Sequence, residues 1–188
     1  MMMSASILVL LGWAGTFVMG IYRDSEEVGI YNVAVKVATL LNFCLQAVNS
    51  ILAPKIASKF AEGEKDASQK MITFSTKLNS ISSLLIGVMI LVFNQQILGF
   101  FGEEFKSARN LLFVLCIGQI INSFSGSVGV VLQMTGKQVV YQYFMLSALV
   151  INLILMFTLT PIYGAYGAAV ASIVSMIFWN IGGAIYLK

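Results

Sequence analysis

Histidine is absent from this chain, and only eight of its 188 residues are aspartate or glutamate. None of those carboxylates lies inside one of the long apolar runs, so the apolar interior lacks the usual metal ligands and the paired acids of general acid–base catalysis. The only cysteines, Cys44 and Cys116, both fall within apolar runs and indicate neither a disulfide framework nor a metal site. These absences predict no catalytic residue, no metal and no cofactor, and therefore a protein that is not an enzyme.

Charge of either sign is scarce as well. Charged residues make up 10% of the chain, against about 25% in an ordinary soluble domain. Hydrophobic residues make up 59%, and the mean hydropathy is +0.89. The apolar runs are long and continuous, unlike the alternating segments of about 10 residues that build a transmembrane β-barrel. The sequence therefore predicts an all-α, polytopic membrane protein, for which we expect no nucleic-acid partner.

Six apolar runs are long enough to cross a bilayer as helices, so we expect residues 1–188 to form a single six-helix bundle. The first run resembles a signal peptide only superficially, because it lacks a basic start and a clean cleavage motif. Pro54 is expected to end the second span, and Gly63 to divide a polar cytoplasmic loop at 55–77 into two helical pieces. The expected spans are 4–21, 28–53, 78–100, 108–134, 138–159 and 164–187.

Basic residues are unequally divided between the two sides of the predicted bundle. By the positive-inside rule the richer side, with both termini and the loop at 55–77, is cytoplasmic. Acidic residues are interspersed among the five lysines of this loop, which favours a solvated connector over a dedicated lipid-headgroup site. The richer side carries Lys55, Lys59, Lys65, Lys70, Lys77, Lys137 and Lys188, and the other side carries Arg23, Lys106 and Arg109.

A lysine lies close to the middle of the second expected span. Lys36 is eight residues from Val28, which places it about 12 Å deep in a hydrocarbon slab of roughly 30 Å. A cation at that depth is costly and requires a polar partner or a watery cavity. Polar side chains of the same span share its helical face, as expected for a wall between lipid and a polar space. The candidates on this face, besides Lys36, are Asn32, Thr39, Asn42, Gln46 and Asn49.

Two interpretations of these polar groups stay open. They line a cavity and bind a substrate, or the lysine bonds to backbone carbonyls and the amides bind adjacent helices. We favour the cavity for Lys36, because charge inside a membrane is functional by default, and hold the two interpretations equal for the amides. In the fourth span, Gln119 and Asn122 share a face and join the cavity candidates. Gly126 and its neighbouring serines favour close helix approach or bending.

Five stretches carry a resemblance to a known family. Together they resemble the carboxy-terminal part of a polysaccharide flippase of the multidrug/oligosaccharidyl-lipid/polysaccharide exporter superfamily, of the O-antigen transporter type. They occur in the order of that family and cover nearly the whole chain. The stretches are EVGIYNVAVKVATL at 27–40, NSILAPKIASKFAEGEKD at 49–66, LGFFGEEFKSARNLL at 98–112, GQIINSFSGSVGVVLQMTGKQ at 118–138 and PIYGAYGAAVAS at 161–172.

The resemblance implies two six-helix bundles around a central cavity, of which this chain matches the second. The partner would be a missing amino-terminal bundle or a second copy, and enzymes of polysaccharide assembly are further partners that the resemblance allows. It also implies the movement of a lipid-linked saccharide of the polyprenyl diphosphate type across the cytoplasmic (inner) membrane of a prokaryote. In that family a basic residue of this helix lines the cavity, which corresponds here to Lys36.

Two other functions compete with this one. A multidrug or cation antiporter of the same superfamily is expected to place carboxylates in its cavity, whereas the spans of this chain offer a lysine and no carboxylate. A non-transporting membrane scaffold requires only that the six helices be stable. Because the spans offer a lysine and no carboxylate, Lys36 favours an anionic substrate, such as a diphosphate or an acidic sugar. Membrane lipid is the only other small partner expected.

Overall fold

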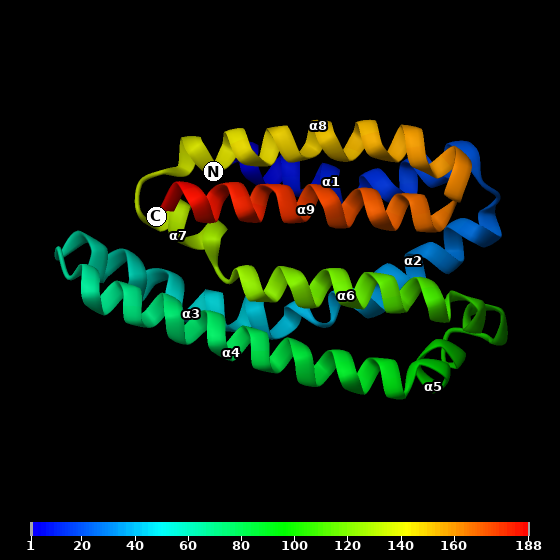
Figure 1. Cartoon of the computed structure of the whole chain (residues 1–188), viewed down its shortest axis with the longest axis horizontal. Helices are drawn as coiled ribbons and strands as arrows, with labels where there is room; N and C mark the ends of the chain where they lie inside the picture. The colour runs from blue at the N-terminus through cyan, green and yellow to red at the C-terminus, as the bar shows by residue number, and fades with distance from the viewer. Residues whose placement is uncertain (1, 188) are drawn as a thin grey trace.

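The computed structural model describes residues 2–187, except for the side chains of residues 2–5, Cys44 and Lys65. This described part is helical and contains no strand, so the predicted all-α class is confirmed. Its long helices run side by side, and both chain ends lie near the end of the bundle where α7 connects to α8 (Figure 1). The elements are α1 (Met2–Tyr22), α2 (Ser25–Thr39), α3 (Asn42–Ala61), α4 (Lys65–Val92), α5 (Asn94–Gly99), the 3-10 helix η1 (Glu103–Ala108), α6 (Arg109–Ser125), α7 (Val128–Met134), α8 (Gln138–Tyr163) and α9 (Ala165–Leu187).

Several of these helices have the length and composition of membrane spans. Four helical stretches are long and apolar enough to cross a bilayer, and Ser6–Tyr22 is a shorter apolar helix. This agrees with a polytopic membrane protein, but it does not confirm six spans, because the expected second span is divided into two helices. The four stretches are Asp66–Val92, Glu103–Met134, Gln138–Tyr163 and Ala165–Leu187.

The prediction of one regular helix over 28–53 is wrong, because the helix is interrupted between Thr39 and Asn42. Thr39 Oγ1 donates to the carbonyl of Lys36 at 2.8 Å, while the Leu40 N–H bonds to the carbonyl of Val37 at 3.2 Å. The hydroxyl thus takes the acceptor that a regular helix offers to the N–H four residues on. The interruption begins four residues after Lys36 and needs neither glycine nor proline.

The expected loop at 55–77 consists of two helical pieces, as predicted, and these pieces form a hairpin that continues α3 into α4. α3 continues past Pro54 to Ala61, and α4 begins at Lys65, so the prediction that the proline ends the second span is wrong. Proline removes one backbone hydrogen bond, but α3 is supported along its length by α4 (Figure 1). The predicted break at Gly63 is confirmed, because its φ of +78° forms the turn in a conformation that suits glycine.

The expected fourth span, 108–134, is interrupted as well. Gly126 separates α6 from α7 with φ +70°, and a Cβ at this position would clash with Thr76 Oγ1 on α4. Only glycine fits there, which confirms the bending role predicted for this residue. The short helix α7 then packs against α3, α8 and α9.

The largest cluster of buried apolar side chains joins α2, α6 and the beginning of α9. Small side chains in this cluster allow the helices to approach closely, as is common in membrane bundles. The cluster therefore fixes which face of α2 points inward. Its members include Tyr31, Ala34, Val37 and Ala38 of α2, Leu111, Leu112, Leu115 and Cys116 of α6, and Ala165, Ala168 and Ala169 at the start of α9.

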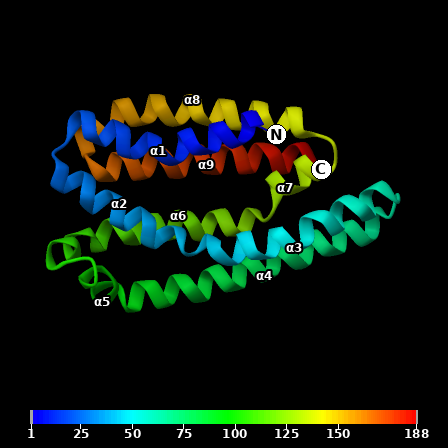
Figure 2. The same cartoon turned by 180° about the vertical axis from the view of Figure 1, so that it is seen from behind.

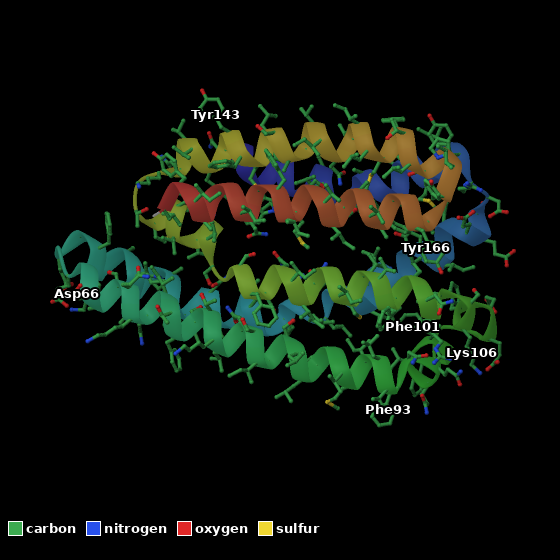
Figure 3. All side chains as sticks on the ribbon, in the orientation of Figure 1. Asp66, Phe93, Phe101, Lys106, Tyr143 and Tyr166 are labelled. Carbon is green, nitrogen blue, oxygen red and sulfur yellow. The ribbon has the colours of Figure 1, made fainter. Side chains whose placement is uncertain are left out.

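The two ends of the bundle differ in charge. The turns α3–α4 and α7–α8 form one end, which we call the hairpin end, and the turns α1–α2 and α8–α9 form the other, which we call the clasp end (Figure 1). Asp66 and Lys106 mark these opposite ends in Figure 3. Most of the described lysines lie at or near the hairpin end. This agrees with the sequence, which predicted one side of the bundle rich in basic residues and one side poor in them. Which end is cytoplasmic stays a prediction.

Candidate functional site

Lys36 lies on the face of α2 opposite the buried apolar cluster. Ala34, Val37 and Ala38 on the inner face are 0%, 2% and 1% exposed, whereas the Lys36 side chain is exposed. Its ammonium has no hydrogen-bond or ion-pair partner among the described residues. In Figure 2, α1, α2 and α3 lie on the side of the bundle that faces the viewer. A cation that the sequence places deep in the bilayer is therefore presented outward by this bundle.

Polar and apolar side chains follow Lys36 along the exposed side of α2 and α3. Thr39 and Gln46 are exposed, as the cavity interpretation requires. Leu40 and Phe43 are 53% and 71% exposed and lie between them in the sequence. We call these five residues the Lys36 strip. The strip offers one cation, hydrogen-bonding groups and apolar surface, and it contains no carboxylate.

Asn32, another cavity candidate, is half-buried and held by neighbouring groups. Its Oδ1 accepts from Thr16 Oγ1 of α1 at 2.6 Å, and its Nδ2 donates to the carbonyl of Val28 at 2.9 Å. These bonds satisfy both ends of the amide. Asn32 therefore joins α1 to α2 in this bundle rather than extending outward with Lys36.

A chain of amides connects α3, α6 and α9. Asn42 Nδ2 donates to Gln119 Oε1 at 2.9 Å, and Asn122 Nδ2 donates to Asn42 Oδ1 at 3.4 Å. Asn180 Nδ2 donates in turn to Asn122 Oδ1 at 2.8 Å. We call these four residues the amide chain. It begins directly after the interruption between α2 and α3, and so it positions the start of α3 against two other helices.

Asn49 makes a similar contact further along α3, closer to the hairpin end. Its Oδ1 accepts from Ser127 Oγ, and the hydroxyls of Ser127 and Ser75 lie 3.2 Å apart. This links α3 to α4 and to the segment between α6 and α7. The structure thus divides the eight candidates: Lys36, Thr39 and Gln46 are each exposed, while Asn32, Asn42, Asn49, Gln119 and Asn122 bond to neighbouring helices. Whether any of them binds a substrate stays a prediction.

Asn180 was not among the residues predicted from the sequence. It is 1% exposed in α9 and also donates to the carbonyl of Met176 at 3.0 Å. Its signal in the sequence is a solitary amide in the last apolar run, and an intramembrane polar group of that kind calls for a partner. Its partner, Asn122, was among the candidates.

A second unpredicted group lies at the clasp end. Arg23 Nη2 donates to the carbonyls of Thr160 and Pro161 at 3.2 and 3.0 Å, where α8 ends. Glu27 Oε1 accepts from the Ala165 N–H at 2.9 Å, where α9 begins, and Glu27 Oε2 lies 3.8 Å from Arg23 Nε. The pair satisfies backbone groups that helix ends leave free. We call these two residues the clasp.

A cavity of about 680 Å³ opens at the hairpin end, between the α3–α4 hairpin and the break that separates α6 from α7. None of the eight predicted site residues lines it, although Ser127, the partner of Asn49, does. No cluster of three or more metal-ligating side chains occurs among the described residues. The groups that the described site residues offer to a ligand are an ammonium, amides, hydroxyls and apolar surface.

Comparison with known proteins identifies the family of the chain. Residues 1–158 match the MatE family. The chain is 29% identical over 182 residues to the probable low-salt glycan biosynthesis flippase Agl15 of Haloferax volcanii, covering 94% of this chain and 38% of that protein. It is 23% identical over 174 residues to the probable flippase AglR of the same organism, covering 90% of this chain and 36% of that protein.

The chain spans less than two fifths of the length of these curated relatives. No solved structure matches it significantly. Because the family match extends over most of the sequence and the helices suit a membrane, this chain is a polytopic membrane protein that belongs to the MatE family, within the superfamily that its sequence resembles.

Proposed function

We propose that this chain forms one bundle of a flippase that moves a lipid-linked oligosaccharide across the cytoplasmic membrane of a prokaryote by alternating access. The observation that carries the proposal is the exposed, unpartnered ammonium of Lys36 on the outward face of α2. Two relatives named as probable flippases, one of them for glycan biosynthesis, support the substrate class.

The free-energy cost of placing a charged side chain in hydrocarbon indicates what the Lys36 strip faces. A lysine near the centre of a membrane helix costs about 2.5–3.5 kcal/mol on insertion scales, and more in simulations of isolated helices. Such a group is retained where it faces water, a substrate or another helix bundle. The curated relatives are more than twice as long as the part matched here, which gives them room for a second bundle. We infer that the strip faces such a bundle across a polar cavity.

The chemistry of the strip suits the head of a lipid-linked saccharide. The ammonium of Lys36 donates to diphosphate oxygens, and Thr39 and Gln46 exchange hydrogen bonds with sugar hydroxyls. Phe43 and Leu40 supply apolar surface for the faces of the sugar rings. The polyprenyl tail stays in the hydrocarbon, so the protein shelters the head alone.

The runner-up function is cation antiport, which the charge of the strip disfavours. A cationic drug requires carboxylates, and the strip contains none.

In the proposed flippase, both termini and the hairpin end are cytoplasmic, in keeping with the excess of lysines at that end. Enzymes of glycan assembly are the expected partners on either side of the membrane. The other competing function is a membrane scaffold that transports nothing, and the test below distinguishes it from a flippase.

The test is translocation in proteoliposomes that contain the assembled transporter and a lipid-linked oligosaccharide with a lectin-accessible head. Lys36→Gln removes one charge-assisted hydrogen bond, a contribution of about 1.5–3 kcal/mol, and is expected to lower the rate about 10- to 150-fold. Lys36→Arg is expected to retain most of the rate, because it keeps the charge. Lys77→Gln, which removes an exposed lysine of α4 that lies outside the strip, is the matched control.

The variants are compared at equal amounts of reconstituted protein. If Lys36→Gln transports at the rate of the unmodified protein, the strip does not bind the head group and the proposal fails. If Lys77→Gln is equally impaired, the effect belongs to the net charge rather than to the strip.

A further inference from the structure

The cavity at the hairpin end has two kinds of wall. Ile56, Phe60, Ile72 and Val131 supply apolar surface, and Ser68 and Lys137 supply polar groups. Among the described residues, no carboxylate lines it. Its volume of about 680 Å³ falls within the range of about 300–1,000 Å³ typical of small-molecule sites. The lining therefore favours a ligand with one apolar part and one anionic part.

Ser68 presents a buried hydroxyl without a partner. The residue is 4% exposed, and its Oγ makes no hydrogen bond. Buried polar groups in folded proteins are almost always paired, so an unpaired hydroxyl in a cavity wall indicates a missing acceptor. Because this oxygen is itself covered, it reaches the phosphate of a bound head group after rotation of the Ser68 side chain toward the cavity.

Lys137 makes the same cavity electropositive. Its ammonium lies 4.8 Å from the ring centroid of Tyr186, and no carboxylate of the described residues pairs with it. The residue also directly precedes α8, a helix of 26 residues with no acidic side chain in its first turn. The positive end of that helix dipole therefore adds to the charge of the lysine.

We propose that this cavity binds the phosphate head group of an anionic membrane lipid from the leaflet at the hairpin end. Lys137 and Ser68 donate to the phosphate oxygens, and the first part of the acyl chain lies against Phe60, Ile72 and Val131. The site is separate from the Lys36 strip, because no residue of the strip lines it. A structural lipid here would tie the α3–α4 hairpin to α7, to α9 and to Lys137 at the start of α8, whichever substrate the protein carries.

The experiment is native mass spectrometry of the 188-residue chain in detergent, titrated with phosphatidylglycerol and, separately, with phosphatidylcholine. Phosphatidylglycerol, which has a net negative charge, is expected to bind more tightly than the zwitterionic phosphatidylcholine, and Lys137→Gln to weaken phosphatidylglycerol binding about 10-fold and to reduce this preference. Lys137→Arg should restore the affinity. Lys70→Gln is the matched control, because it removes an exposed lysine of α4 near the same end that does not line this cavity.

A second variant, Ala184→Phe, adds volume at an exposed position of the cavity wall and leaves every lysine in place. It is expected to displace phosphatidylglycerol and keeps the test decisive if Lys137→Gln fails to fold. Equal losses in Lys137→Gln and Lys70→Gln would overturn the proposal in favour of general surface charge. Unchanged binding in Ala184→Phe would place the lipid elsewhere. Displacement of the lipid by inorganic phosphate at equal concentration would reduce the site to one for free anions and also overturn the proposal.

Discussion

Replacement of Glu27 by alanine removes the carboxylate that holds the beginning of α9. Its Oε1 accepts from the Ala165 N–H at 2.9 Å, and its Oε2 lies 3.8 Å from Arg23 Nε. A hydrogen bond to a charged group contributes about 1.5–3 kcal/mol, and a helix cap about 0.5–2 kcal/mol. Both clasp side chains are about one third exposed, so the ion pair adds little, about 0–1 kcal/mol. We expect Glu27→Ala to lower the free energy of unfolding by about 1.5–3 kcal/mol.

The neighbouring residue provides the control. Glu26 is exposed in the same first turn of α2 and has no partner among the described residues. Glu26→Ala removes the same charge from the same helix end, a loss of about 0.3–1 kcal/mol. Glu27→Gln keeps an oxygen acceptor and should fall between the two alanine variants.

Two measurements report on the clasp. Equilibrium unfolding in mixed micelles with increasing SDS gives the global stability, and hydrogen exchange of the amides around Ala165 reports the α8–α9 turn directly. Faster exchange at the turn in Glu27→Ala, but not in Glu26→Ala, is the expected result. Equal stability and equal exchange in the two variants would refute the capping role of Glu27.

Three further predictions follow from particular residues. Gly126→Ala should destabilise the protein by about 1–3 kcal/mol in SDS unfolding. Adding Thr76→Ala to this variant should recover only part of the loss, because the backbone strain remains. Full recovery would show that the side-chain clash alone causes the loss. Asn180→Leu should cost about 0.6–1.7 kcal/mol, whereas the exposed Asn110→Leu should be neutral. Lys59 lowers the pKa of Glu62 by hydrogen bonding, so their pairing is intact above the ordinary pKa of a carboxyl group and is lost as pH falls through the lowered value. Protection against hydrogen exchange at 60–66, taken relative to the intrinsic exchange rate at each pH, should fall on acidification, and the fall should be smaller in Glu62→Gln, where Lys59 keeps only Glu64 as a partner; equal falls in the two proteins would contradict the pairing.

Composition and periodicity were sufficient for the fold class and for the orientation of Lys36. Long apolar runs leave helices as the only stable backbone in a membrane, and helical periodicity correctly placed Lys36 opposite the buried residues of α2. Gly63 and Gly126 also gave correct breaks, because their positive φ suits glycine.

Other features depend on contacts that a single sequence does not display. The interruption after Lys36 arises from a hydroxyl competing for one carbonyl, and any threonine in a helix carries that capacity without always using it. Pro54 is tolerated because α4 packs along α3. The amides could not be assigned to cavity or packing, since their partners, such as Asn180 for Asn122, come from distant segments.

The central claim is that Lys36 faces water within the membrane, and thiol chemistry tests it directly. Lys36→Cys and Ile154→Cys are compared in the assembled transporter after replacement of Cys44 and Cys116. Ile154 is 58% exposed and lies at a similar depth from the clasp end, about 13 Å. A membrane-impermeant thiosulfonate reacts with thiolates in water, so it should label position 36 rapidly and position 154 hardly at all. Slow labelling of both positions would show that Lys36 does not line an aqueous cavity.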